Sequence, residues 1–272
     1  MGSSRASHAL SIAIPDSFTS NYRGLLQKSL SIGFLARACA IFKVEDIYIY
    51  REREEAPNLK SSSLISKLLG YLETPQYLRK HLFKVDPDLK HVGLLPPLRT
   101  PHHKLRVSVE ELEIGSFREG VVVGREGGFH RVYVGLDEDV LTEAVGRLRG
   151  RVTVMVKDKR EGRIYGEVVD KGDVVEYWGF RVHTLDSGLS GLLRSTRDRL
   201  RVLTSRWGTS ISEVLGDLGG RLRSQGKALI VFGGPYRGVY EILKDVGANP
   251  EDLGDFIVNT VPKQGTATIR VE

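Results

Sequence analysis

The chain has 272 residues, 40% hydrophobic and 27% charged, so it can bury a sizeable core and general disorder is excluded. Its 40 Lys and Arg against 34 Asp and Glu give a formal net charge of +6, which favours an anionic partner only weakly. An apolar run of about 18 residues, the length that spans a membrane, is absent, and the N-terminus lacks an apolar signal core, so we expect neither membrane insertion nor secretion.

Cysteine and histidine usage limits the possible chemistry. The single cysteine, Cys39, excludes an intramolecular disulfide and a thiolate zinc site, and it favours a cytoplasmic location. Cys39 lies within a helical apolar pattern, so we interpret it as a core residue rather than a nucleophile. His102 and His103 are adjacent and cannot share a helix face. We therefore predict no metal site and a polar contact for this pair.

The first part of the chain has the pattern of a strand, a helix and a second strand. Residues 10–14 form a short apolar run, 23–42 repeat apolar residues every three or four positions, and 44–50 indicate another strand. This succession predicts a crossover connection and a parallel sheet. Further helical patterns follow over 61–72 and 75–83.

The pattern changes to β-type near residue 100. Three prolines in 96–104 predict an extended linker. Between 106 and 175, short β-type runs are separated by glycine, which predicts a small antiparallel barrel. These runs cover 120–124, 129–136, 151–156 and 162–169.

An α/β pattern returns after residue 188. The predicted helices cover 194–203, 210–222 and 236–246, and the predicted strands cover 228–232 and 256–258. Ser210 and Glu213 have the spacing of a capping box. The chain is thus predicted to hold an α/β domain of residues 8–100 and 176–272, interrupted by a β module of residues 101–175.

Most of the surplus positive charge lies in one stretch. Between residues 190 and 227, eight basic residues stand against three acidic ones. Such a stretch can contact the phosphates of an anionic partner, or it can be an ordinary solvated helix face, and composition leaves both interpretations open. The candidate contacts are Arg194, Arg197, Arg201 and Arg206.

Two loops are candidate ligand sites, because ligands of parallel α/β sheets gather at the carboxyl ends of strands. Gly233-Gly234-Pro235 follows one predicted strand, and its glycines allow close approach of the backbone. Residues 259–266 follow another strand and offer hydroxyls and a carboxamide. A plain turn remains the alternative for both loops. The sequence has neither a GxGxxG nor a GxxxxGK[ST] motif, which argues against the common nucleotide sites.

Three segments together resemble the SPOUT superfamily of S-adenosylmethionine-dependent RNA methyltransferases. They are residues 28–50, 228–235 and 256–272, and the NTVPKQGTATIR motif in the last one is the most specific. PPLRTPHH at 96–103 and EYWGFRV at 176–182 make the chain similar to the archaeal and eukaryotic branch, in which a β-barrel interrupts the domain.

The resemblance implies a fold, a cofactor and an assembly. The fold would be α/β, with a SPOUT-type parallel sheet, a C-terminal trefoil knot and a small OB-like β-barrel insertion. S-adenosyl-L-methionine would be the cofactor and RNA the partner, in a homodimer with each active site near the subunit interface. The implied cofactor-binding residues are Gly233, Gly234, Pro235, Asn259, Thr260, Val261, Pro262, Gly265 and Thr266.

The resemblance favours uridine N3 in ribosomal RNA as the methyl acceptor. This nitrogen must lose its proton, so a base or a stabilising cation is needed. Asp16 is the candidate base, although an Asp at a strand end is also a common turn residue. Arg37 is the candidate cation or RNA contact. Trp178 either stands in a loop of the knot region or packs at a domain junction.

We therefore predict an S-adenosylmethionine-dependent methyltransferase that modifies a base of ribosomal RNA. One alternative is a ribosome-assembly or RNA-binding factor that keeps the fold and performs little catalysis. Another is a ribose 2′-O methyltransferase, because the sulfonium chemistry does not depend on which atom attacks.

Overall fold

The computed structural model describes residues 9–143, 146, 148–269 and 271. It divides the chain into two compact units. Unit 1 comprises Met1–Gly70, His91–Pro96 and Phe180–Glu272, and unit 2 comprises Tyr71–Lys90 and Pro97–Gly179. No helix in the described ranges is long and apolar enough to cross a membrane.

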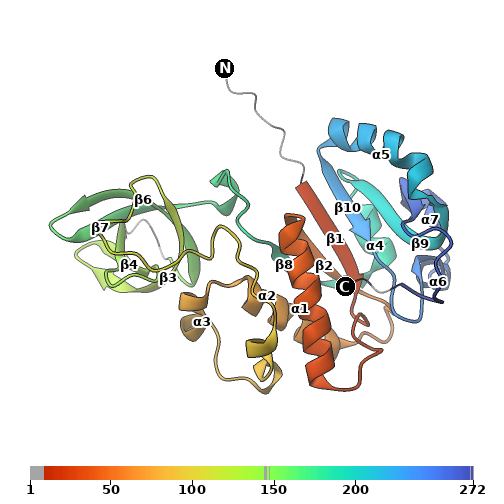
Figure 1. Cartoon of the computed structure of the whole chain (residues 1–272), viewed down its shortest axis with the longest axis horizontal. Coiled ribbons are helices and arrows are strands. Elements are labelled where there is room, and N and C mark those ends of the chain that lie inside the picture. The colour runs from red at the N-terminus through yellow and green to blue at the C-terminus, as the bar shows by residue number, and fades with distance from the viewer. Residues whose placement is uncertain (1–8, 144–145, 147, 270, 272) are drawn as a thin grey trace. The chain divides into compact units, whose positions relative to one another are not determined.

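Unit 1 is built on a six-stranded sheet in which every strand pairing is parallel (Figure 1). In spatial order the strands are β11 (Phe256–Asn259), β9 (Leu200–Ser210), β10 (Lys227–Val231), β1 (Ala9–Pro15), β2 (Val44–Arg51) and β8 (Arg181–Gly188). Helix α1 (Leu25–Ile41) connects β1 to its neighbour β2. The predicted strand–helix–strand start and the parallel α/β sheet are therefore confirmed.

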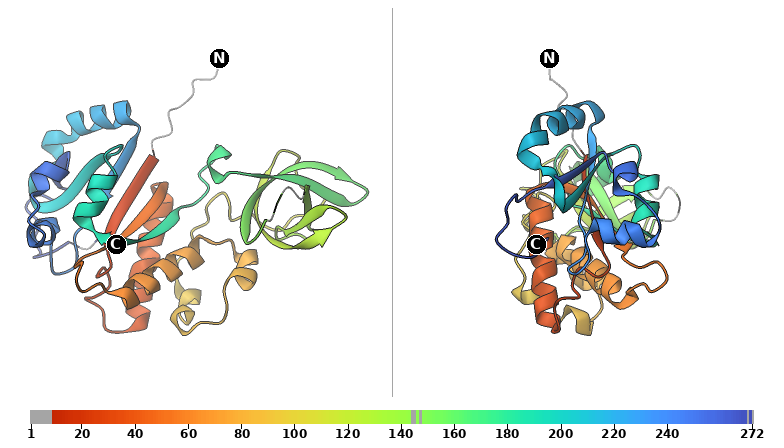
Figure 2. Two further views of the ribbon diagram at one scale, coloured as in Figure 1. Left: turned by 180° about the vertical axis from the view of Figure 1, so that it is seen from behind. Right: turned by 90° about the vertical axis from the view of Figure 1, so that its right-hand side faces the viewer.

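Helices pack on both faces of this sheet (Figure 2). The helices after the β8 strand are α4 (Leu189–Ser195), α5 (Ile211–Gln225), α6 (Val239–Asp245) and α7 (Pro250–Leu253). Helix α5 covers Val202 and Ala228, whereas α4, α6 and α7 cover the next residues along the same strands, Leu203 and Leu229. Successive strand residues point to opposite faces, so a strand buried on both faces needs a continuous apolar run.

Two expectations for unit 1 are wrong. The helix predicted over 194–203 is instead the end of α4 followed by β9, because Leu200, Val202 and Leu203 are buried as a central strand requires. The capping box at the start of α5 is not formed: Ser210 makes no side-chain cap, and its hydroxyl lies 2.7 Å from that of Ser212. Strand β8 and helix α7 had no predicted counterpart.

Unit 2 contains a closed barrel of five strands. They are β3 (Phe117–Glu126), β4 (Phe129–Tyr133), β5 (Val140–Glu143), β7 (Arg163–Val169) and β6 (Arg151–Arg160), in order around the barrel. Valines and Ile164 fill its interior. The four predicted β runs are confirmed, but the short strand β5 was missed. It pairs with β7 in parallel, so the barrel is not wholly antiparallel.

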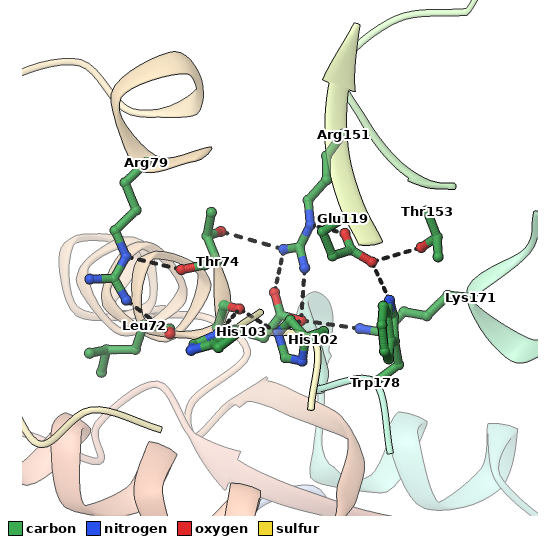
Figure 3. Close-up of polar contacts among 11 residues, drawn as sticks. Leu72, Thr74, Arg79, His102, His103, Glu119, Arg151, Thr153, Lys171 and Trp178 are labelled. Atoms are coloured by element: carbon green, nitrogen blue, oxygen red, sulfur yellow. Dashed lines mark hydrogen bonds and ion pairs between the residues drawn. The ribbon is translucent and has the colours of Figure 1, made fainter. Parts of the chain in front are cut away.

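Helices precede the barrel in the chain: α2 (Leu59–Glu73) ends in unit 2, and α3 (Gln76–Leu82) follows it. A buried polar cluster joins the end of α2 to the barrel strands (Figure 3). Glu73 forms ion pairs with Arg151 of β6 and, at 3.2 Å, with Lys171. Arg151 also pairs with Glu119 of β3, which accepts a hydrogen bond from the indole N–H of Trp178.

The adjacent histidines belong to the same group of contacts, which we call the Glu73 cluster. The Nε2 atoms of His102 and His103 each lie 2.8 Å from the carbonyl oxygen of Glu73. The polar contact predicted for this pair is confirmed. Trp178 is buried within unit 2, and Cys39 is buried in α1 as expected, where burial raises the pKa of its thiol to about 12.

Charges in the Glu73 cluster are balanced by neighbours. Burial opposes ionisation of Glu73, but Arg151, a hydrogen bond from His102 and the charge of Lys171 together hold the pKa of this carboxyl well below its usual range. Burial also lowers the pKa of His103 to about 4, so its ring is neutral at pH 7. Within the described ranges, no group of His, Cys, Asp and Glu could hold a metal ion.

The substitution Glu73→Gln should lower the free energy of unfolding by about 3 kcal/mol, because it removes one of the two buried carboxylates that pair with Arg151 and also the ion pair with Lys171. The folded-state pKa of Glu73 lies below its unfolded value. The contribution of Glu73 to stability is therefore complete at pH values above the usual carboxyl range and is lost as the pH falls below that range. The free energies of unfolding of the parent and the variant should then converge on acidification. Urea denaturation at several pH values measures both effects.

A matched control comes from the exposed ion pair between Lys157 and Glu167. The substitution Glu167→Gln should change the free energy of unfolding by less than about 1 kcal/mol. Equal decreases in the free energy of unfolding for the two substitutions would contradict a larger contribution of the buried Glu73 to stability.

Candidate active site

One pocket of unit 1 brings the two candidate loops together. Its volume is about 240 Å³, and it is lined by residues that follow β10 and β11 and by part of β9. These strands are parallel, so the loops that follow β10 and β11 lie at the same edge of the sheet. Five of the predicted cofactor residues line this pocket: Gly233, Gly234, Pro235, Asn259 and Thr260.

The other four predicted residues, Val261, Pro262, Gly265 and Thr266, are not among the described residues that line the pocket. Two of them make hydrogen bonds within the same segment. The backbone N–H of Val261 donates to Asn259 Oδ1 at 3.0 Å, and the Thr266 hydroxyl donates to the carbonyl of Thr268 at 2.9 Å. Other residues of the segment complete the wall instead: Gln264, Ala267, Thr268, Ile269 and Val271.

The two glycines after β10 allow a close approach, as predicted, but the approach is to the protein's own chain. A Cβ atom on Gly233 would lie 2.8 Å from the Cα of Gly238. A Cβ atom on Gly234 would collide with the carboxylate of Glu52, and the Gly234 N–H donates to the carbonyl of Arg237 at 2.7 Å. The loop therefore folds tightly on itself, and side chains at these two positions would open it.

Strand β9 leaves its ladder with β11 at the pocket. Ile257 pairs with Leu203, but the next residue, Val258, pairs with Thr209. Residues 204–208 therefore bulge out of the register, and we call them the 204–208 segment. Its first four residues line the pocket. Sequence reasoning missed this feature, because we had assigned part of the strand to a helix.

The 204–208 segment is fixed at three points. The Thr204 hydroxyl donates to the carbonyl of Val231 at 2.9 Å, and Asn259 Nδ2 donates to the carbonyl of Arg206 at 2.9 Å. A Cβ atom on Gly208 would lie 2.6 Å from the carbonyl oxygen of Ile257, so only glycine fits there. Asn259, predicted as a cofactor residue, thus ties two walls of the pocket together.

Arg237 brings positive charge to the pocket wall. Its guanidinium pairs with Asp245, and its Nη1 atom is buried without a hydrogen-bond partner among the described residues. The carboxylate of Glu52 lies 4.0 Å from that nitrogen. A buried donor of this kind costs free energy unless a ligand satisfies it, so an acceptor group in the pocket would be stabilised here.

Asp16 and Arg37, the predicted catalytic residues, do not line this pocket among the described residues. Asp16 is buried after β1, and its two carboxylate oxygens accept hydrogen bonds from the backbone N–H groups of Glu52 and Asn58, at 3.1 Å and 2.7 Å. This carboxylate holds the segment after β2 in place. Arg37 is half-buried on α1.

The four predicted RNA-contact arginines differ in their surroundings. Arg194 and Arg197 are exposed at and after the end of α4. Arg201 is mostly buried and binds the carboxylate of Asp255 through its backbone N–H at 2.8 Å and its Nε at 2.9 Å. Arg206 is exposed and lines the pocket. The structure therefore brings Arg206 to the pocket and gives Arg201 a structural contact.

Comparison with known proteins shows the family to which the chain belongs. A family model described as "Putative RNA methyltransferase" matches residues 9–272. The chain belongs to this family. The match covers both units, including the barrel and the pocket loops.

Relatives occur in eukaryotes and archaea. The 28S rRNA (uridine-N(3))-methyltransferase of Drosophila melanogaster is 32% identical over 297 residues, which cover 97% of this chain and 59% of the relative. The human protein of the same name is 32% identical over 298 residues, 97% of this chain and 75% of the relative. An uncharacterized protein of Haloarcula marismortui is 29% identical over 280 residues, which cover 96% of this chain and 94% of the relative.

Two arginines of this RNA methyltransferase family member should respond differently to removal. Arg201→Ala should lower the free energy of unfolding by about 1–2 kcal/mol, because it removes the side-chain hydrogen bonds of Arg201 to the charged Asp255, which keeps the backbone N–H of residue 201 and Arg221 as donors. Arg197→Ala changes an exposed side chain, so its free energy of unfolding should stay within about 0.5 kcal/mol of the parent value. Urea denaturation measures both, and a stable Arg201→Ala protein would show that the ion pair with Asp255 contributes little.

Proposed function

We propose that the protein is an S-adenosylmethionine-dependent RNA methyltransferase that modifies a base of ribosomal RNA, with uridine N3 as the favoured acceptor. The observation that carries the proposal is the single pocket formed by Gly233–Pro235 and the segment after β11, in a chain matched by an RNA methyltransferase family over residues 9–272. The choice of uridine N3 in ribosomal RNA is supported by the printed names of the fly and human relatives.

The residues present fit S-adenosylmethionine as the methyl donor. The buried Arg237 Nη1 can donate to the carboxylate of the methionyl part. Hydroxyls of Thr204, Ser205 and Thr260 line the same pocket and can bind the ribose, and backbone groups of the two loops can bind the adenine edge. Bound there, the cofactor supplies a methyl group that is already activated by its sulfonium.

The protein's own work is to hold the acceptor in line, exclude water and stabilise the anion that forms when N3 loses its proton. Arg206 lines the pocket and supplies positive charge for that anion. Asp16 as the base and Arg37 as a cation or RNA contact stay predictions from the sequence. Because both oxygens of Asp16 already accept backbone hydrogen bonds, we assign the larger contribution to the cations.

The finer features of the fold belong to the same proposal. We propose a C-terminal trefoil knot and an OB-like character for the barrel, with a discontinuous methyltransferase domain of residues 8–100 and 176–272 around an insertion of residues 101–175. The return of the last strand, β11, to the side of β9 and the closed five-stranded barrel support this assignment.

A homodimer is the assembly that we propose. Support comes from α1, which exposes Leu26, Phe34 and Ile41 at spacings that place them along one side of the helix, with Phe42 just beyond its end. Apolar side chains gathered on one helix face indicate an interface. Arg37 lies on the same helix, so a second copy there would bring a charged side chain to the interface.

Gly233→Val should weaken S-adenosylmethionine binding at least about tenfold, because the loop must open to accept a side chain next to Gly238. Gly216→Val is the matched control: its Cβ atom, on helix α5, would have no neighbour within 4 Å, and Gly216 is not among the described residues that line the pocket, so affinity should be unchanged. Isothermal titration calorimetry measures both. Equal binding by parent and Gly233→Val would exclude this pocket as the cofactor site.

Nucleoside mass spectrometry of ribosomal RNA, from cells with and without the gene, tests the activity. Loss of N3-methyluridine, restored by the parent but not by Gly233→Val, is the expected result. Loss of a 2′-O-methylated nucleoside would instead assign the ribose as acceptor. An unchanged profile, with the cofactor not bound, would favour a ribosome-assembly factor with little catalysis.

Phe34→Glu should convert the homodimer into monomers, since a charge would be buried at the proposed interface. Leu215→Glu places the same charge at an exposed apolar position of α5 and should leave the oligomeric state unchanged. Sedimentation velocity distinguishes the two states. A parent protein that is itself monomeric would overturn the homodimer.

A further inference from the structure

The two tryptophans of the chain have opposite surroundings. Trp178 is 4% exposed and donates its indole N–H to Glu119, whereas Trp207 is 67% exposed. Tryptophan is usually among the most buried residues of a protein, because its large apolar surface is costly to hydrate. The folding of the chain therefore does not account for the exposure of Trp207, which indicates a role in binding.

The backbone around Trp207 is held in place rather than loose. Trp207 lies in the 204–208 segment, next to Gly208, whose backbone packs against that of Ile257. The backbone N–H of Trp207 donates to the Ser205 hydroxyl at 3.2 Å, and the backbone carbonyl of Arg206 accepts a hydrogen bond from Asn259 Nδ2. An aromatic ring presented to solvent on a fixed backbone loses little conformational entropy when a ligand stacks on it.

One face of the indole is already occupied by a cation. The guanidinium carbon of Arg206 lies 4.6 Å from the centroid of the Trp207 ring, the geometry of a cation–π contact. Arg206 also donates through Nη1 to the carbonyl of Ala267 at 3.2 Å, which ties it to the pocket wall. Since two thirds of the Trp207 surface stays exposed, much of the ring remains open to a ligand.

Trp207 also borders the pocket. Trp207 and Tyr236, which is 76% exposed, are both lining residues, and Arg206 and Arg237 line the same pocket. Exposed aromatic rings next to arginines are the combination that binds single-stranded nucleic acid, because the rings stack on bases and the cations attract phosphates.

We propose that Trp207 is the platform on which the acceptor base, a pyrimidine of single-stranded RNA, stacks at the mouth of the pocket. The inference rests on the proposed function and names the residue that positions its substrate. A base that enters an enzyme pocket must leave its own stack, and an aromatic side chain replaces the lost stacking. S-adenosylmethionine is a poorer candidate for stacking on Trp207. The tight loop of Gly233–Pro235 suits a buried ligand, whereas the exposed ring of Trp207 faces solvent.

The test compares two substitutions at the same position. Trp207→Leu keeps an apolar side chain without a ring, and Trp207→Phe keeps a smaller ring. We expect Trp207→Leu to bind a single-stranded oligouridylate of about ten nucleotides about tenfold more weakly than the parent. Trp207→Phe should show a smaller loss of affinity for the same oligonucleotide. In methylation assays the Leu substitution should raise KM more than it lowers kcat, as expected for lost substrate positioning.

Intrinsic fluorescence reports on the ring directly. The difference between the spectra of the parent and Trp207→Phe isolates the signal of Trp207 from that of buried Trp178. Oligouridylate should quench this difference signal, and an RNA duplex of the same length should quench it far less, because its bases are already stacked. S-adenosylmethionine alone should leave it unchanged.

The outcomes separate the inference from the proposed function. Equal oligouridylate affinity for the parent and Trp207→Leu, or quenching of Trp207 by S-adenosylmethionine, would overturn the platform. Cofactor affinity of the parent, measured by calorimetry, tests the methyltransferase itself. Loss of cofactor binding in Trp207→Leu would assign the ring to the cofactor and also overturn the inference, whereas unchanged cofactor affinity with weakened RNA binding supports it.

Discussion

Parallel pairing of β9, β10 and β11 is the constraint on which the candidate site depends. Because the strands run in the same direction, the loops that follow β10 and β11 emerge at one edge of the sheet, although 25 residues or more of sequence separate them. The register break between β9 and β11 then takes residues 204–208 out of the ladder, and the first four of them line the pocket. Backbone geometry, more than any single side chain, therefore creates the pocket.

Close backbone contacts keep these walls together. Gly233 packs against Gly238, Gly208 packs against Ile257, and Asn259 spans from one wall to the carbonyl of Arg206. Each of these contacts excludes a larger side chain or supplies a hydrogen bond to a backbone group that the bulge leaves unpaired. A site built in this way holds its donors and aromatic ring in fixed positions before a ligand arrives, which lowers the entropic cost of binding.

Local patterns predicted the parts of the fold that bury one regular face. The β1–α1–β2 start and the barrel runs were recognisable, because their apolar residues recur at helix or strand spacing. Residues 196–203 were misread, since arginines at 197, 199 and 201 suggested a solvated helix, whereas Arg201 is bound by Asp255, a residue distant in sequence. The 204–208 segment was not predictable, because a register break depends on which strands become neighbours. The pocket loops were identified from their place after predicted strands, and the motif resemblance supplied nine cofactor residues in them, of which five line the pocket.

The Glu73 cluster shows why a distinctive motif need not mark the site of chemistry. PPLRTPHH and EYWGFRV contribute His102, His103 and Trp178, residues that in another setting would suggest catalysis. Here they surround a buried carboxylate that joins the first and last parts of unit 2 to strands β3 and β6. A charge pair that is costly to leave incomplete favours one arrangement of these segments within unit 2 over alternatives. The polar residues of the two motifs are thus accounted for by contacts within unit 2. The exposed Trp207 and Arg237, whose Nη1 has no hydrogen-bond partner among the described residues, line the candidate pocket instead.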